Sequence, residues 1–175
     1  MTIHSTHPFA DADPDPARRF RGRVGGAVTL WTAGSGGSEG AGGAEQAGLT
    51  VTSLMVALGP EPVVLALLDP DSDLLDVLRD TGRAVVQLLT WPDRQLAEAF
   101  AGTAPAPGGP FRQAPFTPTA HGPRLTSAAT YAFVRLVSER EVGWSVEVTV
   151  ALEDVVVGEA DGDALLHRRG RFLRG

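Results

Sequence analysis

A short apolar stretch of the chain carries three small hydroxyl groups. Residues 48–58 read GLTVTSLMVAL, and the hydroxyls are those of Thr50, Thr52 and Ser53. Threonine and serine can donate and accept hydrogen bonds without filling much space. A few placed polar groups in an apolar lining are typical of a small-molecule site. A strand with one solvated face would give the same pattern, so these residues alone leave both interpretations open.

A second stretch, DPDSDLLD, concentrates carboxylates. Asp69, Asp71, Asp73 and Asp80 occupy the first, third, fifth and twelfth places of a calcium-binding EF-hand loop. The sixth place of such a loop must turn sharply and is normally glycine, whereas here it is Leu74. We therefore interpret these residues as acids near the start of a helix, where negative charge is favoured, and predict no metal site.

Missing residue types exclude several chemistries. The chain has no cysteine and, because all 15 of its basic residues are arginine, no lysine. A thiolate metal site, a cysteine nucleophile, a Walker A phosphate loop and a pyridoxal Schiff base are therefore excluded. The four histidines are too scattered to indicate a zinc site, and no G-x-S-x-G nucleophile motif is present.

The charge balance argues against nucleic acid as a partner. The formal charge is −6, which repels a phosphate backbone. Arginines cluster near both ends, in RRFRGR (18–23) and RRGRFLR (168–174), and we interpret both clusters as solvated faces that offset the many acids. No stretch approaches the roughly 18 apolar residues of a membrane span. The N-terminus lacks the apolar core of a secretory signal, so we expect a cytoplasmic protein.

The elements that must position these residues are mostly strands. Apolar or alternating runs predict strands over 26–33, 48–58, 62–68, 84–89, 130–142 and 144–153, and a closing segment over 164–173. Ser72 or Asp73 would begin one short helix that ends at Gly82, and Thr90 with Asp93 would begin another. About six strands and two short central helices favour an antiparallel barrel over an open α+β sheet.

The length is that of one compact domain. We expect this domain to cover residues 18–175, after a disordered or extended lead-in over 1–17 that is rich in proline, aspartate and alanine. The glycine-rich segment 34–43 misses the spacing of a phosphate-binding loop and is interpreted as a flexible hairpin tip.

Taken in order, several segments resemble those of the flavin reductase-like, FMN-binding split-barrel proteins. They are GAVTLWTA, GLTVTSLMVAL, PVVLALLDPDSDLLDVLRDTGRAVVQLL, QLAEAFAG and GDALLHRRGRF, and the resemblance runs from about Phe20 to Phe172. It implies a mainly β fold, an antiparallel Greek-key split β-barrel with two short helices, and a homodimer. It also implies FMN, or alternatively FAD, as the cofactor, NADH or NADPH as hydride donor, and a monooxygenase as partner.

The resemblance assigns the flavin side of a site. In the family, the segment that matches Thr50, Val51, Thr52 and Ser53 runs along the isoalloxazine ring. The loop that holds the flavin phosphate matches a segment that contains Asp69 and Ser72. An arginine, such as Arg83 or Arg168, would neutralise the phosphate.

The substrate side of the site is assigned in the same way. Glu147 takes the place, on the nicotinamide side, at which many relatives carry histidine. His167 takes a place at which relatives often carry an aromatic residue, and it would stack or form a hydrogen bond there, next to Arg168.

The acidic loop departs from the family pattern. Asp69, Asp71 and Asp73 put carboxylates where amides and hydroxyls are expected. At about 5 Å and an effective dielectric of about 20, each like charge costs a phosphate roughly 3 kcal/mol. Two hypotheses therefore remain open: an NAD(P)H-dependent flavin oxidoreductase in which Ser72 holds the phosphate, and a non-catalytic split-barrel binding protein with weakened FMN affinity. The second would take another planar ligand, such as a deazaflavin or haem, or act as a dimeric scaffold.

Overall fold

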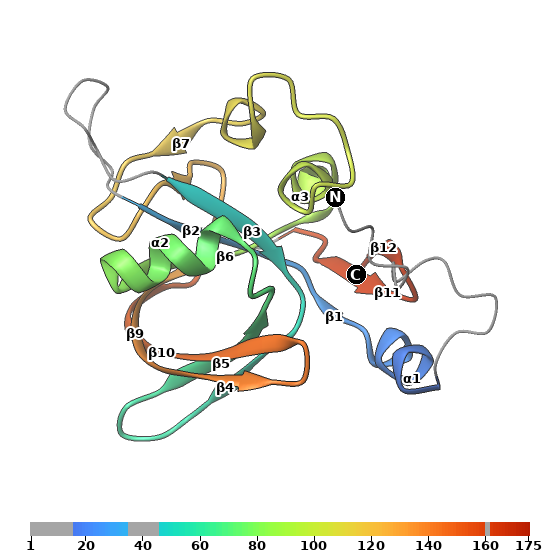
Figure 1. Cartoon of the computed structure of the whole chain (residues 1–175). Helices are drawn as coiled ribbons and strands as arrows, with labels where there is room; N and C mark the ends of the chain where they lie inside the picture. The colour runs from blue at the N-terminus through green and yellow to red at the C-terminus, as the bar shows by residue number, and fades with distance from the viewer. Residues whose placement is uncertain (1–15, 35–45, 160–161) are drawn as a thin grey trace, which may run out of the picture.

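The computed structural model describes residues 16–34, 46–159 and 162–175 of the chain (Figure 1). Most of the expected lead-in over 1–17, and residues 35–43 of the expected hairpin tip, lie outside the described residues. The helices are α1 (Pro16–Val24), α2 (Asp73–Thr81) and α3 (Arg94–Phe100), with short 3-10 turns η1 (Trp91–Asp93) and η2 (Pro110–Arg112). The strands are β1 (Gly26–Ala27), β2 (Thr29–Ala33), β3 (Ala47–Val51), β4 (Leu54–Ala57), β5 (Val63–Leu68), β6 (Arg83–Leu88), β7 (Phe116–Thr117), β8 (Arg124–Leu125), β9 (Tyr131–Val142), β10 (Ser145–Val156), β11 (Leu165–Arg168) and β12 (Arg171–Arg174).

The main sheet has seven strands in the order β3-β2-β6-β9-β10-β5-β4, and every neighbouring pair is antiparallel. The hairpin of β9 and β10 is inserted between β6 and β5, which gives the Greek-key crossover. The sheet curls, so that its two edge strands, β3 and β4, are connected by only residues 52 and 53 although they stand at opposite ends of this strand order (Figure 1). The antiparallel Greek-key barrel predicted from the sequence is therefore confirmed.

The strand predicted over 48–58 is two strands, and that expectation was wrong. β3 pairs with β2 at one edge of the sheet and β4 pairs with β5 at the other edge, so the chain must change partners between them. Thr52 and Ser53 form this corner. The carbonyl oxygen of Ser53 accepts a hydrogen bond from the Leu67 amide at 2.9 Å, which holds the corner against β5. Small residues suit a point where the backbone turns between two partners.

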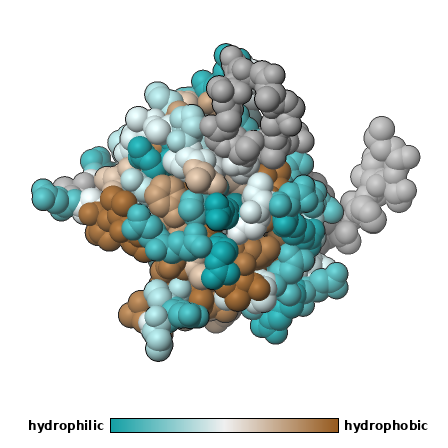
Figure 2. Space-filling model, turned by 90° about the vertical axis from the view of Figure 1, so that its left-hand side faces the viewer, coloured by the Kyte–Doolittle hydropathy of each residue, from teal (hydrophilic) through white to brown (hydrophobic). Residues whose placement is uncertain are grey.

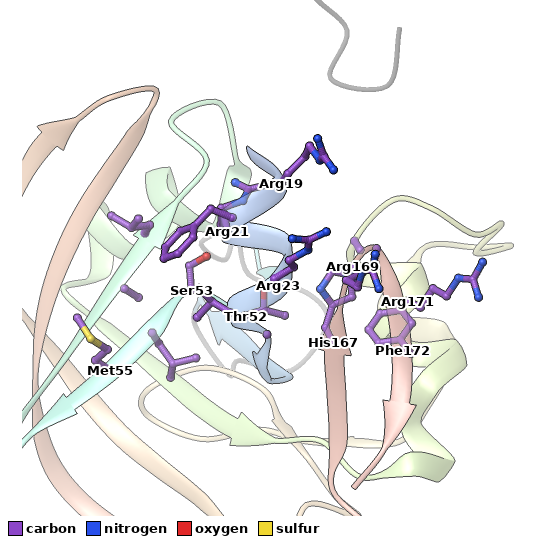
Figure 3. Close-up of a pocket in the computed structure, with 18 of the residues that line it drawn as sticks. Arg19, Arg21, Arg23, Thr52, Ser53, Met55, His167, Arg169, Arg171 and Phe172 are labelled. Carbon is purple, nitrogen blue, oxygen red and sulfur yellow. The ribbon is translucent and has the colours of Figure 1, made fainter. Parts of the chain in front are cut away.

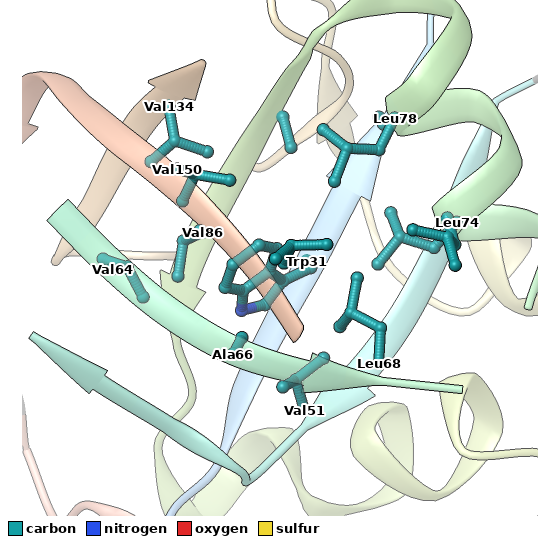
Figure 4. Packing of buried hydrophobic residues seen from close by; sticks show 14 of the residues in the cluster. Trp31, Val51, Val64, Ala66, Leu68, Leu74, Leu78, Val86, Val134 and Val150 are labelled. Atoms are coloured by element: carbon teal, nitrogen blue, oxygen red, sulfur yellow. The ribbon is translucent and has the colours of Figure 1, made fainter. Parts of the chain in front are cut away.

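Two apolar clusters occupy the two sides of β2. The fully buried Trp31 lies in the barrel interior with residues from β3, β5, β6, β9, β10 and α2 (Figure 4). Leu30 points the other way, into a cluster with Leu96, Ala97 and Phe100 of α3. Because both of its faces are covered, β2 is buried along its whole length, and its apolar residues need not alternate with polar ones.

Several local expectations are confirmed. Ser72 caps the N-terminus of α2, and Gly82 ends that helix in the left-handed conformation, with a φ of 68°. Thr90 and Asp93 form the predicted capping box before α3. In β10 the alternation holds for Val146, Val148 and Val150, which are all buried. It fails at Trp144, which was expected to point inward but is 97% exposed at the β9–β10 turn.

A second, three-stranded sheet of β1, β11 and β12 brings the two ends of the described chain together. Gly26 pairs with His167 and Ala27 pairs with Leu166. Helix α1 precedes β1 directly, so this pairing places α1 beside the β11–β12 hairpin (Figure 1).

Candidate functional site

An open groove of about 1560 Å³ lies between α1, the Thr52–Ser53 corner and the β11–β12 hairpin (Figure 3). Apolar side chains contribute much of its lining. They come from β4, β5 and α1 and include Leu54, Met55, Leu65, Leu67, Phe20 and Val24. Met55 and Phe20 are 70% and 74% exposed, so apolar surface is left open to a ligand in this groove.

The corner supplies the hydroxyls of the groove. Thr52 and Ser53 are both half-buried and line it. Neither hydroxyl forms a hydrogen bond with any other residue that the structure describes, so both are available to a ligand. The chain entering β1 passes close behind them: a Cβ added to Gly26 would lie 3.1 Å from the carbonyl oxygen of Thr52. Because glycine has no Cβ, the backbone can pass this close to the corner, and both α1 and the corner can line the same groove.

Arginines dominate the charge of the groove. Among the described residues, six arginines and two glutamates line it. The arginines are Arg19, Arg21, Arg23, Arg94, Arg169 and Arg171. Within the described part of the chain none of these six forms an ion pair with a carboxylate. A chain with a formal charge of −6 therefore has a locally positive groove, which favours an anionic ligand.

The two arginine clusters of the sequence meet at this groove. Arg19, Arg21 and Arg23 project from α1, and Arg169 and Arg171 project from the β11–β12 hairpin (Figure 3). Their side chains are solvent-exposed, as the sequence suggested, but the structure also brings them to one site. Arg168 joins the two elements, because its Nε donates a hydrogen bond to the carbonyl oxygen of Arg23 at 3.2 Å.

Glu147 lines the groove as a carboxylate whose negative charge is balanced by an ion pair with Arg140. Nε and Nη2 of Arg140 donate to its two carboxylate oxygens, each at 2.9 Å. These hydrogen bonds hold the pKa of Glu147 below its ordinary value and raise that of Arg140. Because the ion pair cancels its charge, Glu147 repels an anion in the groove only weakly.

His167 faces the groove from β11. Its ring lies 5.3 Å from that of Phe172, centroid to centroid, in an edge-on arrangement. Burial, and secondarily the positive charge of Arg21, lower the pKa of His167 below its ordinary value. The imidazole is therefore neutral near pH 7 and offers a flat ring with one donor and one acceptor.

Of the sequence-predicted residues, the structure thus brings together Thr52, Ser53, Glu147 and His167. The other predicted residues are absent from the lining of this groove: Thr50, Val51, Asp69, Ser72, Arg83 and Arg168. Thr50 uses its hydroxyl on the carbonyl oxygen of Ala97, and Val51 is buried in the core. Arg83 is an exposed residue at the start of β6.

Ser72 and Asp69 form hydrogen bonds within the turn that precedes α2. The hydroxyl of Ser72 donates to the carbonyl oxygen of Asp69 at 2.7 Å and accepts a hydrogen bond from the Leu75 amide. A carboxylate oxygen of Asp69 accepts a hydrogen bond from the Asp71 amide at 2.9 Å. These contacts are the cap of a helix, so the electrostatic cost expected from the acidic loop does not fall on the groove.

Sequence reasoning named Arg168 but missed the other arginines of α1 and of the hairpin that line the groove, which are Arg19, Arg21, Arg23, Arg169 and Arg171. Both clusters were visible as local runs of charge, but they are far apart in the chain, and only the pairing of β1 with β11 brings them together. Among the described residues, no helix is long and apolar enough to cross a membrane. The described His, Cys, Asp and Glu residues also form no group of three or more arranged to bind a metal ion.

Comparison with solved structures shows where this fold occurs. An NADH:FAD oxidoreductase of Streptomyces globisporus, in a complex with NAD and FAD fragments, superposes with a TM-score of 0.77 at 21% identity, over 91% of this chain and 90% of that chain. The styrene monooxygenase flavin reductase of Pseudomonas putida S12 gives 0.76 at 20% identity, over 92% and 97%. BorF, the flavin reductase component of a bacterial two-component tryptophan halogenase, gives 0.74 at 18% identity, over 90% and 95%. These likenesses establish a shared fold, the split barrel.

Sequence comparison identifies the family. No curated protein matches the chain. The profile described as "Flavin reductase like domain" matches residues 21–175, which include the corner, α2, α3, both long strands and the C-terminal hairpin. The chain therefore belongs to the flavin reductase like domain family.

Proposed function

We propose that the protein is an oxidoreductase that binds a flavin, FMN or FAD, in the α1–hairpin groove and passes hydride to it from NADH or NADPH. The observation that carries this proposal is the composition of the groove. Apolar surface lies at the corner together with two hydroxyls that have no partner among the described residues, and beside them lie arginines that form no ion pair within the same part of the chain. A flavin has the matching parts: a flat ring that is apolar at one end and polar at the other, and a phosphate.

The corner suits the ring. The hydroxyls of Thr52 and Ser53 would donate to, or accept from, the polar edge of the ring, while Leu54 and Met55 would contact its apolar end. Covering Met55 and Phe20 with a planar ligand would remove apolar surface from water, which is favourable by about 25 cal/mol per Å². The corner carbonyl of Ser53 is fixed by the Leu67 amide, so these contacts are preorganised.

The arginines of α1 suit the phosphate. Guanidinium groups bind phosphate oxygens through charge-assisted hydrogen bonds, and Arg21 and Arg23 have no carboxylate partner among the described residues. This assignment replaces the one expected from the sequence, in which Ser72 and either Arg83 or Arg168 would hold the phosphate. The Ser72 hydroxyl is engaged in the cap of α2, and neither Ser72 nor Arg83 lines the groove.

A second ring also has room in the groove. Its volume of about 1560 Å³ exceeds the roughly 300–1,000 Å³ of ordinary ligand sites. When bound, a flavin would supply a ring that can accept a hydride from the nicotinamide, and the protein would mainly orient the two rings and limit water. Glu147 and the neutral His167 line the groove where a nicotinamide could lie, and the ion pair with Arg140 keeps Glu147 from adding net negative charge there.

A second copy of the chain would cover the open side of the groove. Apolar side chains next to it are exposed: Met55, Val56 and Leu58 after the corner, and Leu67 on β5. Figure 2 shows that apolar areas reach the surface between polar ones on one face of the molecule. A homodimer that buries β4 would remove this apolar surface from water. The solved relatives named for a monooxygenase and a halogenase support a flavin-consuming monooxygenase as a further partner.

The experiment begins with the purified protein. Its absorbance in the flavin bands is recorded, FMN and FAD are titrated by quenching of flavin fluorescence, and the loss of NADH or NADPH is followed with excess flavin. We expect micromolar or tighter flavin binding and flavin-dependent nicotinamide oxidation. Ser53→Phe, which fills the groove, should abolish flavin binding and nicotinamide oxidation, whereas Ser127→Phe, at an exposed residue outside the lining, serves as the matched control.

The outcomes separate the two hypotheses. Flavin binding without nicotinamide oxidation would favour the non-catalytic binding protein. Absence of flavin binding, with haem or a deazaflavin bound instead, would favour that protein with a different planar ligand. Light scattering reports the oligomeric state, and a monomer at micromolar concentration would contradict the proposed dimer.

A further inference from the structure

The turn between β11 and β12 has an arginine where a small residue is usual. Arg168 pairs with Arg171 across the hairpin, so Arg169 and Gly170 are the two central residues of the turn. Both have positive φ, 55° for Arg169 and 74° for Gly170. Such turns favour Asn, Asp or Gly at the first central position, because other residues pay a steric cost there. Arg169 is the only described non-glycine residue with positive φ.

Three arginines surround a smaller hollow at this turn. It has a volume of about 510 Å³ and is lined by Arg168, Arg169, Arg171 and Leu173. Arg169 and Arg171 also line the main groove, so the hollow continues from it. The turn is anchored to α1, because Nε of Arg168 donates to the carbonyl oxygen of Arg23. The hollow therefore lies next to the α1 arginines but on a different element.

No carboxylate of the described chain neutralises these three arginines. The next arginine of the same hairpin behaves differently: Arg174 forms an ion pair with Asp163. Three like charges within one turn repel one another, and this repulsion is relieved when an anion binds between them. Their forked donors suit the oxygens of phosphate.

We propose that the β11–β12 turn is a second phosphate subsite, which binds the additional phosphate of a dinucleotide. The inference rests on the proposed function, in which the α1 arginines hold the first phosphate of a flavin. The same chemistry has two sources: the pyrophosphate of FAD and the 2′-phosphate of NADPH. The subsite thus selects FAD over FMN, or NADPH over NADH.

The test removes the guanidinium groups without disturbing the turn. Arg169→Asn keeps a residue that tolerates positive φ, so the hairpin should fold at least as well as in the wild type. Arg171→Gln removes the second guanidinium. Arg112→Gln, at an exposed residue of η2 outside both hollows, is the charge-matched control. Thermal unfolding of all variants establishes that each one folds.

Three ratios are measured for each variant: the affinity for FAD over FMN, the KM for NADH over NADPH, and the affinity for inorganic pyrophosphate by calorimetry relative to wild type. We expect pyrophosphate affinity and one of the two selectivities to fall roughly tenfold for each arginine removed, with no change for Arg112→Gln. The selectivity that falls identifies the source of the phosphate.

The inference is overturned if the folded variants bind pyrophosphate as tightly as wild type, or if wild type does not bind it. It is also overturned if both selectivities are unchanged in Arg169→Asn and Arg171→Gln. Failure of the proposed function would give a different result, because the wild-type protein would then show no flavin-dependent nicotinamide oxidation. The pyrophosphate measurement does not depend on that activity.

Discussion

The hydroxyl of Thr50 donates a hydrogen bond to the carbonyl oxygen of Ala97, 2.7 Å away, and thereby joins strand β3 to helix α3. Three residues further along, the hydroxyl of Ser53 has no partner among the described residues and lies in the groove. Hydroxyls that look equivalent in the sequence therefore have different roles, one in holding the fold and the other in a ligand site.

This difference can be measured with two substitutions. Thr50→Val keeps the shape of the side chain but removes one of the two donors to the carbonyl of Ala97, which keeps only the Ala101 amide, so the free energy of unfolding should fall by about 1 kcal/mol with flavin affinity unchanged. Ser53→Ala should instead weaken flavin binding and leave stability nearly unchanged. Urea unfolding and flavin fluorescence titration measure the two effects, and the reverse pattern would contradict the assignment.

The buried Gln87 is expected to be important for stability. Its Nε2 donates to Thr32 Oγ1 at 3.1 Å and to the carbonyl oxygen of Leu30 at 3.4 Å, and its Oε1 accepts from the Leu125 amide. Gln87→Leu would leave a buried amide and a hydroxyl without these partners, so we expect a loss of about 2 kcal/mol or more in urea unfolding. Gln95→Leu, on the exposed side of α3, should change stability little.

The arginines of α1 should govern flavin affinity through charge. Removing the guanidinium in Arg21→Gln or Arg23→Gln should weaken flavin binding roughly tenfold each, because a charge-assisted hydrogen bond to phosphate is lost. The wild-type affinity should fall as salt is added, and it should fall less steeply in the variants. Riboflavin, which has no phosphate, provides the control: its affinity should be the same in wild type and variants. Equal losses for riboflavin and FMN would argue that the variants damage the ring site instead.

The lowered pKa of His167 should make the stability of the protein depend on pH. Because burial, and then Arg21, lower its pKa in the folded state, the unfolded chain takes up a proton first as the pH falls through the ordinary value of 6.5. The free energy of unfolding should therefore decrease with falling pH from about 7 down towards the lower folded-state pKa, and the contribution is absent above that range. His167→Asn should flatten this part of the pH profile of urea unfolding. An unchanged slope in the variant would show that another group causes it.

The sequence was most informative where local patterns decide the structure. Helix α2 was predicted together with its end at Gly82 and a cap at Ser72 or Asp73, of which the structure uses Ser72, because capping depends on neighbouring residues. The alternation in β10 likewise identified the buried valines. Trp144 continued that alternation in the sequence but lies in a turn, where period-two reasoning no longer applies.

The site was harder to predict because it depends on distant contacts. The strand break at Thr52 follows from closure of the sheet, in which β3 and β4 take partners at opposite edges, and no local signal marks it. The convergence of Arg23 and Arg168 joins residues 145 positions apart in the chain. Composition indicated that arginines were clustered, but only the fold shows that two clusters share a groove.

A crystal structure of the protein with bound FMN or FAD would test the central claim most directly. We predict that the flavin ring contacts the hydroxyls of Thr52 and Ser53, and that the phosphate lies within hydrogen-bond distance of Arg21 or Arg23. Electron density for the ring elsewhere, with the corner covered only by solvent, or for the phosphate at the Asp69–Ser72 turn, would contradict the account.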